Sequence, residues 1–311
     1  MLQSLGLFAR YGRFVLVAGL LAGLALPAVA QALRPWLSEM VLFLLFLTAF
    51  RVGFPATHEG LRRSWSVLGV VLTYQLVLPL VCLGVFGLFG LAQSPVTIAL
   101  TLMLAAPPLT GSPNLSLLLG HSPEPAFRLL VLGTLLLPLT LIPVFWFSPA
   151  LGSLTQALAA ALRLGAALGV TIAFAFVARA LLHPNMSETE IRGVDGITIL
   201  TLAIVVVGLM SAVAPALSTN PAALAGWLFI ALVINLGLQV IAYLVLNRGG
   251  DVVSSAPMAV VAGNRNVALF LVASSATQTD SFLMFLGCYQ IPMYLTPFLM
   301  RPLLGRRIPS A

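Results

Sequence analysis

The sequence predicts an all-α, polytopic membrane protein with about ten transmembrane helices. Its residues are 60% hydrophobic and only 7% charged, and their mean hydropathy is +1.09. Soluble domains are about 45–50% apolar and about 25% charged, so a chain this poor in charge cannot cover itself with a water-soluble surface. Its apolar runs are close to the roughly 20 residues needed to cross a hydrocarbon core of about 30 Å, and short connections separate them.

Ten apolar runs, separated by Arg, Pro and Gly, are the expected spans. They are too long and too uninterrupted to be membrane β-strands, which alternate over about 10 residues. The first run ends in Ala28-Val29-Ala30, a pattern also found where signal peptides are cleaved, but we expect it to remain as a span because the repeat described below includes it. The runs are 13–31, 36–51, 64–90, 95–120, 124–147, 153–182, 195–216, 222–247, 253–275 and 281–301.

The basic residues predict orientation rather than nucleic-acid binding. All fifteen are arginine, the net charge is +7, and they are scattered between apolar runs instead of forming the contiguous patch that nucleic acid requires. With the N-terminus in the cytoplasm, twelve fall on the cytoplasmic side, Arg34 and Arg163 on the outer side, and Arg265 inside a span. We therefore expect a multi-pass protein of a bacterial inner (plasma) membrane with both termini cytoplasmic, membrane lipid as a partner and no nucleic acid.

Paired motifs predict an internal repeat. Two prolines lie five residues apart in the fifth span, at Pro138 and Pro143, and again in the tenth, at Pro292 and Pro297. The third span carries the side-chain amide of Gln75, and the eighth span carries that of Asn235. Residues 1–148 and 149–311 would then be two five-helix repeats, which point in opposite directions because five is odd.

The fourth span has a middle that disfavours continuous helix. Pro107, Pro108 and Pro113 remove backbone donors, and Gly111 loosens the chain. Ser112 before Pro113 is a helix-start signal, with Ser as the N-cap and Pro at the first helical position. We expect the helix to stop near Pro107 and restart at Pro113; the alternative is a Pro-kinked packing helix. Unwound backbone in a membrane requires protein or a water-filled cavity around it.

The ninth span is interrupted by Gly263-Asn264-Arg265-Asn266. An arginine at mid-bilayer costs several kcal/mol unless it faces a cavity or a partner; the alternative is that Arg265 snorkels out of a shifted span. Both breaks fall in the fourth span of their half, so we expect them to cross near the midplane and present half-helix N-termini to a ligand. The candidate substrate-binding residues are Tyr74, Gln75, Thr110, Gly111, Ser112, Asn114, Ser116, Asn264, Arg265 and Asn266.

At these residues the sequence resembles the bile acid:sodium symporter family of the bile, arsenite and riboflavin transporter superfamily. That family has a break followed by Ser-Asn in its fourth span and Glu-x-Gly-x-Gln-Asn in its ninth; Asn114 and Asn266 fall on the two Asn positions. With the ten-span layout and the repeat, the resemblance covers nearly the whole chain. It implies a panel domain and a core domain, each formed by both repeats, broken helices that cross in the core, and organic-anion transport by alternating access.

The sequence departs from the family at its sodium-binding positions. The family's Glu falls on Val261 and its Gln on Arg265, while the Ser before Asn114 becomes Pro113. The hydroxyl ligands expected in the fifth span fall on apolar residues near Ala126 to Val131. A sodium ion about 4 Å from a guanidinium in a partly buried site is repelled by about 4 kcal/mol. We therefore expect no metal site and no certain cofactor, with Arg265 as a built-in counter-ion or an anion anchor.

These features favour a secondary transporter of a small organic anion, working by alternating access without the family's sodium coupling. A sodium-coupled organic-anion or bile-acid-like symporter is one alternative, and a non-transporting sensor or channel-like protein is another. An enzyme is not expected, because no membrane-depth His, paired acids or nucleophile–base pair is present. Glu39 could couple protons, although Arg34 offers it ordinary interfacial pairing. No feature of the sequence indicates an oligomeric state.

Overall fold

The computed structural model describes residues 5–8, 11–62, 65–148, 154–248, 252–272 and 279–305. Within these ranges the regular structure is helical, with one isolated antiparallel bridge between Pro108 and Arg265. Within the described residues, seven helices are long and apolar enough to cross a membrane, which supports the prediction of an all-helical membrane protein. They are Pro27–Phe54, Ser66–Leu88, Glu124–Trp146, Leu158–Leu182, Glu188–Thr219, Pro221–Asn247 and Phe282–Leu299. Shorter apolar helices cover Phe14–Ala25, Pro95–Ala105 and Ser254–Gly263.

The chain forms two compact units, and each unit takes residues from both halves of the sequence. Unit 1 comprises Met1–Glu59, Leu162–Trp227 and Ala268–Gln290. Unit 2 comprises Gly60–Ala161, Leu228–Val267 and Ile291–Ala311. Among the described residues, four α-helices contribute to both units; they are α4 (Leu37–Arg62), α10 (Leu154–Leu182), α13 (Pro221–Asn247) and α15 (Thr279–Leu299).

In unit 1, helix α2 packs closely on α11 through small residues. A Cβ atom added at Gly19 would lie 2.9 Å from the carbonyl oxygen of Ala203, and one added at Gly23 would lie 2.7 Å from Cγ of Met210. Such close backbone approach is the usual way in which membrane helices gain packing contacts. The α-helices that lie wholly in this unit are α2 (Gly12–Ala25), α3 (Pro27–Leu33), α11 (Glu188–Leu209) and α12 (Val213–Thr219).

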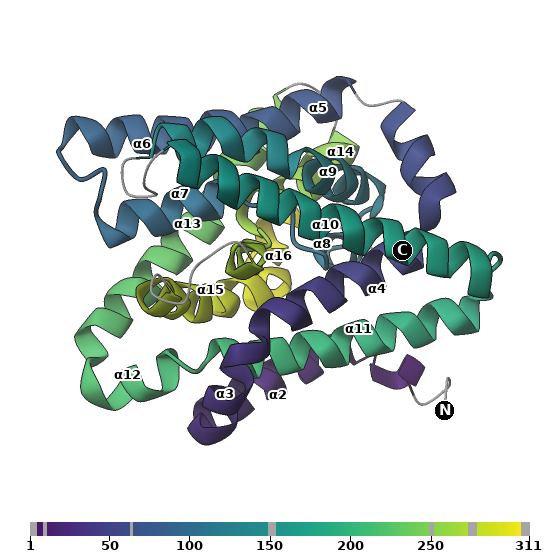
Figure 1. The fold of residues 1–311 in the computed structure, drawn as a ribbon, viewed down its shortest axis with the longest axis horizontal. Coiled ribbons are helices and arrows are strands. Elements are labelled where there is room, and N and C mark those ends of the chain that lie inside the picture. Colours follow the sequence, from purple (N-terminus) through teal and green to yellow (C-terminus); the bar gives the residue numbers. More distant parts are fainter. Residues whose placement is uncertain are drawn as a thin grey trace. The chain divides into compact units, whose positions relative to one another are not determined.

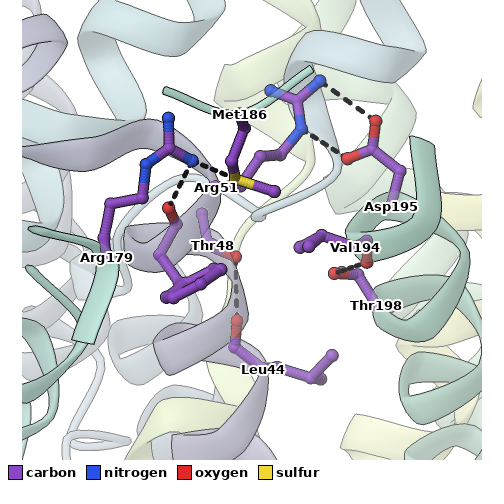
Figure 2. A network of polar contacts seen from close by, with 9 residues as sticks. Leu44, Thr48, Arg51, Arg179, Met186, Val194, Asp195 and Thr198 are labelled. Atoms are coloured by element: carbon purple, nitrogen blue, oxygen red, sulfur yellow. Dashed lines mark hydrogen bonds and ion pairs between the residues drawn. The ribbon is translucent and has the colours of Figure 1, made fainter. Parts of the chain in front are cut away.

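A polar network ties α4, α10 and α11 of unit 1 together (Figure 2). Arg51 of α4 forms an ion pair with Asp195 of α11, and Arg179 of α10 donates a hydrogen bond to the carbonyl of Phe50 and contacts Met186. The Arg51 side chain is 40% exposed, so this ion pair contributes at most about 1 kcal/mol to stability. Its main effect is to fix which helix ends lie together.

In unit 2, helices α6 and α7 run side by side, and α9 packs against α5, α8 and α14 (Figure 1). A π-helical turn at Thr73–Val77 joins α5 to α6. Pro138 and Pro143 lie inside α9, which nevertheless remains a helix. The helices that lie wholly in this unit are α5 (Trp65–Leu72), α6 (Leu78–Leu88), α7 (Pro95–Ala105), α8 (Ser112–Leu118), α9 (Glu124–Trp146), α14 (Val252–Gly263) and α16 (Arg301–Leu304).

Two expected spans are interrupted where no break was predicted, and both lie in unit 1. The first expected span is divided at Leu26, which is not helical and precedes Pro27; a residue before proline is biased away from helix. The seventh is divided after Leu209, and α12 begins at Val213. The side-chain amide of Gln31 donates to the carbonyl of Ser211 at 2.8 Å, so α3 satisfies the backbone that this second interruption exposes.

A candidate binding site where two helix breaks meet

The first break separates α7 from α8. Helix α7 ends at Ala105 because Ala106 is extended, as expected for a residue before Pro107. The predicted interruption is therefore present, and a continuous kinked helix is excluded for this segment. The prediction that Ser112 caps α8 is wrong: the helix begins at Ser112 itself, and no side-chain cap bond is present. Ser112 already has helical backbone, so its hydroxyl is not directed at the amides of the first turn.

The second break follows α14. This helix ends at Gly263, residues 264–266 are not helical, and a 3-10 turn covers Val267–Val272. A Cβ atom at Gly263 would lie 2.1 Å from the carbonyl oxygen of Asn235 in α13. Only glycine allows that approach, because an oxygen of the main chain cannot move aside as a flexible side chain can.

The two breaks lie against each other and satisfy each other's backbone. The amide of Leu109 donates to the carbonyl of Asn264 at 2.9 Å, and the amide of Asn266 donates to the carbonyl of Pro107 at 2.8 Å. Pro108 and Arg265 form the centre of this antiparallel bridge. We call residues 107–111 and 263–266 the crossing. Its two strand-like bonds replace helical hydrogen bonds that the breaks have lost, which is the condition for irregular backbone at membrane depth.

The side chain of Arg265 lies inside unit 2, with 1% of its surface exposed. Its guanidinium donates to the carbonyl of Leu104 at 3.3 Å and lies 5.0 Å from the centroid of the Tyr74 ring. The Leu104 carbonyl belongs to the last turn of α7, where the helix dipole favours a cation, and the ring face adds a cation–π attraction. The alternative in which Arg265 snorkels to an interface is therefore wrong.

Tyr74 and Gln75 both point into unit 2, although consecutive residues of an α-helix diverge by about 100°. They belong to the π-helical turn, a feature that is frequent at functional sites. The Tyr74 hydroxyl donates to the carbonyl of Met258 at 3.3 Å, and the Gln75 amide donates to the carbonyl of Gly133 at 3.1 Å. A Cβ atom at Gly133 would lie 2.7 Å from Cδ of Pro108, so α9 also fits closely against the crossing.

A fully buried cluster of polar side chains supports the second break. The Asn235 amide donates to the carbonyl of Gly263 at 2.5 Å, which satisfies an acceptor at the end of α14. Gln239 donates to the Asn235 side-chain oxygen at 2.8 Å and to the Thr296 hydroxyl at 3.2 Å. Thr296 in turn lies 3.2 Å from the side-chain oxygen of Asn264. We call Asn235, Gln239, Asn264 and Thr296 the support cluster.

Of the support cluster, only Asn264 is among the candidate site residues predicted from the sequence. Asn235 is predicted only as a mark of the repeat, and neither Gln239 nor Thr296 is predicted as a site residue. The available signal was the four-residue spacing of Asn235 and Gln239, which places two amides on one face of an otherwise apolar helix. Polar side chains on one face of a membrane helix usually bond to a neighbouring helix, as these do.

The remaining candidate residues divide into an accessible group and a buried group. Thr110, Gly111 and Asn266 are half-buried and Asn114 is exposed, and the Asn266 amide lies 3.4 Å from the Thr110 hydroxyl. Ser112 and Ser116 are buried; Ser116 bonds to the carbonyl of Ser112 at 3.0 Å. Within the ranges that the structure describes, the Ser112 hydroxyl and the Gln75 side-chain oxygen have no hydrogen-bond partner. We call Thr110, Asn114 and Asn266 the rim residues; Asn266 follows Arg265 directly in the chain and lies 3.4 Å from Thr110.

The chain matches no protein-family model and no curated protein. Its function is therefore inferred from the chemistry of the crossing.

Proposed function

We propose that this protein is a secondary transporter that moves a small organic anion across the membrane by alternating access, without sodium coupling. The observation that carries the proposal is the pairing of two helix breaks beside buried Arg265. Interrupted helices and a buried charge are both costly in a membrane segment, and they occur where a cavity or a transported ligand meets the protein. Transporters commonly place their substrate site at such discontinuous helices.

The substrate site in this proposal is the crossing with its rim residues. Arg265 supplies one positive charge, and Thr110, Asn114 and Asn266 supply hydrogen-bond donors at accessible positions. As a general estimate, at an effective dielectric constant of about 20, a unit charge stabilises an anion at a separation of about 8 Å by roughly 2 kcal/mol and repels a cation equally. A positive charge together with several hydrogen-bond donors favours an organic anion over a neutral or cationic substrate.

The residues present do not fit a sodium ion at the positions that the family resemblance indicates. Val261, at the family's Glu position, is fully buried and has no oxygen in its side chain. The Leu104 carbonyl beside the crossing already accepts a hydrogen bond from the Arg265 guanidinium. A second cation there would be repelled by the first. We therefore propose that Arg265 acts as a built-in counter-ion.

The membrane topology in this proposal is ten spans, with both termini on the cytoplasmic side of a bacterial inner membrane. The three shorter apolar helices support the count, because α7 with α8 and α14 with its 3-10 turn would each complete one span in two pieces. The composition of the two units supports an inverted repeat of residues 1–148 and 149–311, since each unit takes helices from both halves. Panel and core domains would then be formed jointly by the two repeats.

The test is exchange of radiolabelled monocarboxylates by the purified protein in proteoliposomes. Benzoate, pyruvate and lactate serve as probes, in sodium and in choline buffers of equal ionic strength. We expect exchange of at least one probe at the same rate in both buffers. Stimulation by sodium would favour the symporter alternative instead. Exchange of none of the three would overturn the proposed function and favour the sensor or channel-like alternative.

A further inference from the structure

The charge of Arg265 is fixed to the protein by several independent contacts. Its guanidinium is bonded to the Leu104 carbonyl and lies over the Tyr74 ring, and its backbone is held by the bridge to Pro108. Tyr74 is itself bonded to the carbonyl of Met258, in the helix that leads to Arg265. A cation held in this way stays with the protein throughout a transport cycle, whereas a bound sodium ion leaves with the substrate.

The described side chains at the rim and behind the second break do not supply a mobile charge either. The rim residues Thr110, Asn114 and Asn266 are hydroxyl or amide groups, and so are Asn235, Gln239 and Thr296 behind the break. Such groups neither gain nor lose a proton between pH 5 and pH 8. A monoanion bound at this crossing therefore has no co-transported proton to accompany it from these residues.

From the fixed charge of Arg265 and the uncharged groups around it we infer that transport is electrogenic, with one negative charge moving per substrate. We also infer that the protein exports organic monoanions. The inference rests on the proposed function and adds the direction of transport to it. The bacterial inner membrane is negative inside, so its potential drives a lone anion outward. A potential of 100 mV acting on one charge corresponds to a concentration ratio of about 50-fold. The fixed arginine thus attracts the anion into the membrane without contributing to the energy of accumulation.

The test uses the full-length protein in proteoliposomes with a potassium gradient and valinomycin, which sets a potential of either sign. The probes are again radiolabelled benzoate, pyruvate and lactate. Exchange of a probe against itself moves no net charge, so we expect it to be insensitive to the potential. Net flux is expected to be outward when the interior is negative and inward when it is positive. The final inside-to-outside ratio should shift about 50-fold for each 100 mV.

Because the final ratio is an equilibrium quantity, it does not depend on how the protein is oriented in the vesicle. Exchange that persists with a net flux indifferent to the potential would overturn electrogenic export while leaving the proposed function in place. The same holds for a final ratio that shifts in the opposite direction, which would indicate co-transported cations. Absence of exchange for all probes would overturn the proposed function itself, and the inference with it.

Discussion

The guanidinium of Arg265 lies 5.0 Å from the ring centroid of Tyr74, a residue from the other half of the chain. The hydroxyl of the same tyrosine donates to the carbonyl of Met258 at 3.3 Å, in the helix whose break carries Arg265. One side chain therefore holds both the charge and the helix that presents it. Its two contributions can be separated, because the ring and the hydroxyl are removed by different substitutions.

We predict that Tyr74→Phe destabilises the protein slightly and Tyr74→Leu considerably more. The first removes one hydrogen bond, which contributes about 0.5–1.5 kcal/mol. The second also removes the aromatic face beneath a desolvated cation, which contributes about 2 kcal/mol in addition. Thermal unfolding of the detergent-solubilised protein measures both, in the order wild type, Tyr74→Phe, Tyr74→Leu. Equal midpoints for the two variants would mean that the ring does not stabilise the guanidinium.

Gly263→Ala is expected to disrupt the second break. Its Cβ atom would lie 2.1 Å from the carbonyl oxygen of Asn235, so α13 and α14 would have to separate. Overpacking of this kind typically costs about 1–3 kcal/mol, and a backbone clash lies at the upper end. Gly237→Ala is the matched control: it changes glycine to alanine in the adjoining helix, and a Cβ atom there meets no described atom within 4 Å.

The control is expected to be neutral or stabilising by up to about 1 kcal/mol, since alanine favours helix over glycine. The measurement is the midpoint of thermal unfolding together with the yield of monodisperse protein after solubilisation. Comparable losses for both alanine variants would show that the close approach of Gly263 to Asn235 is unimportant.

The positions of both breaks could be predicted from the sequence because each is encoded locally. Helix is disfavoured by Pro107 and Pro108 in the fourth span and by Gly263-Asn264 in the ninth, whatever packs around them. An interruption of the helix could therefore be expected at both places. The inward direction of Arg265 was also predictable, since a guanidinium at that depth in an apolar run requires a partner.

Features that depend on which helices meet could not be predicted in the same way. The interruption after Leu209 contains no Pro or Gly at residues 210–212, and its exposed carbonyl at Ser211 is satisfied by Gln31, from a distant part of the chain. The bond from Gln239 to Thr296 likewise joins two helices, and periodicity within either helix does not identify its partner. The sequence also predicts that α8 begins at Pro113, whereas it begins one residue earlier, at Ser112. The Ser112 hydroxyl therefore does not cap the helix.

The support cluster is predicted to act as a coupled unit. Gln239→Leu and Thr296→Val each remove one partner of the 3.2 Å hydrogen bond between α13 and α15. A double-mutant cycle should give a coupling energy of about 0.6 kcal/mol, and at most about 1.7 kcal/mol, the range for hydrogen bonds between membrane helices. The measurement is unfolding by denaturant in mixed micelles.

The matched control for this cycle pairs Gln239→Leu with Thr140→Val. The Thr140 hydroxyl is also buried, but it donates to the carbonyl of Leu137 within its own helix. We expect no coupling beyond experimental error in the control cycle. If Gln239 couples equally to both threonines, the measured energy reflects general loosening of the unit rather than a specific bond.

The final prediction concerns the charge of Arg265, which Arg265→Lys retains and Arg265→Gln removes. Lysine offers a cation to the Leu104 carbonyl and the Tyr74 ring but lacks the planar fork of arginine, so some stability should be lost while the field at the rim persists. Glutamine keeps hydrogen-bonding capacity without the charge. The loss of roughly 2 kcal/mol of attraction for an anion should lower monocarboxylate exchange in sodium-free buffer about 30-fold, whereas Arg265→Lys should retain most of it. Thermal unfolding of each variant separates misfolding from loss of affinity. If Arg265→Lys and Arg265→Gln unfold at the same temperature and exchange monocarboxylates at the same rate, the charge has no role in binding. The substrate would then be held by the hydroxyl and amide groups of the rim alone.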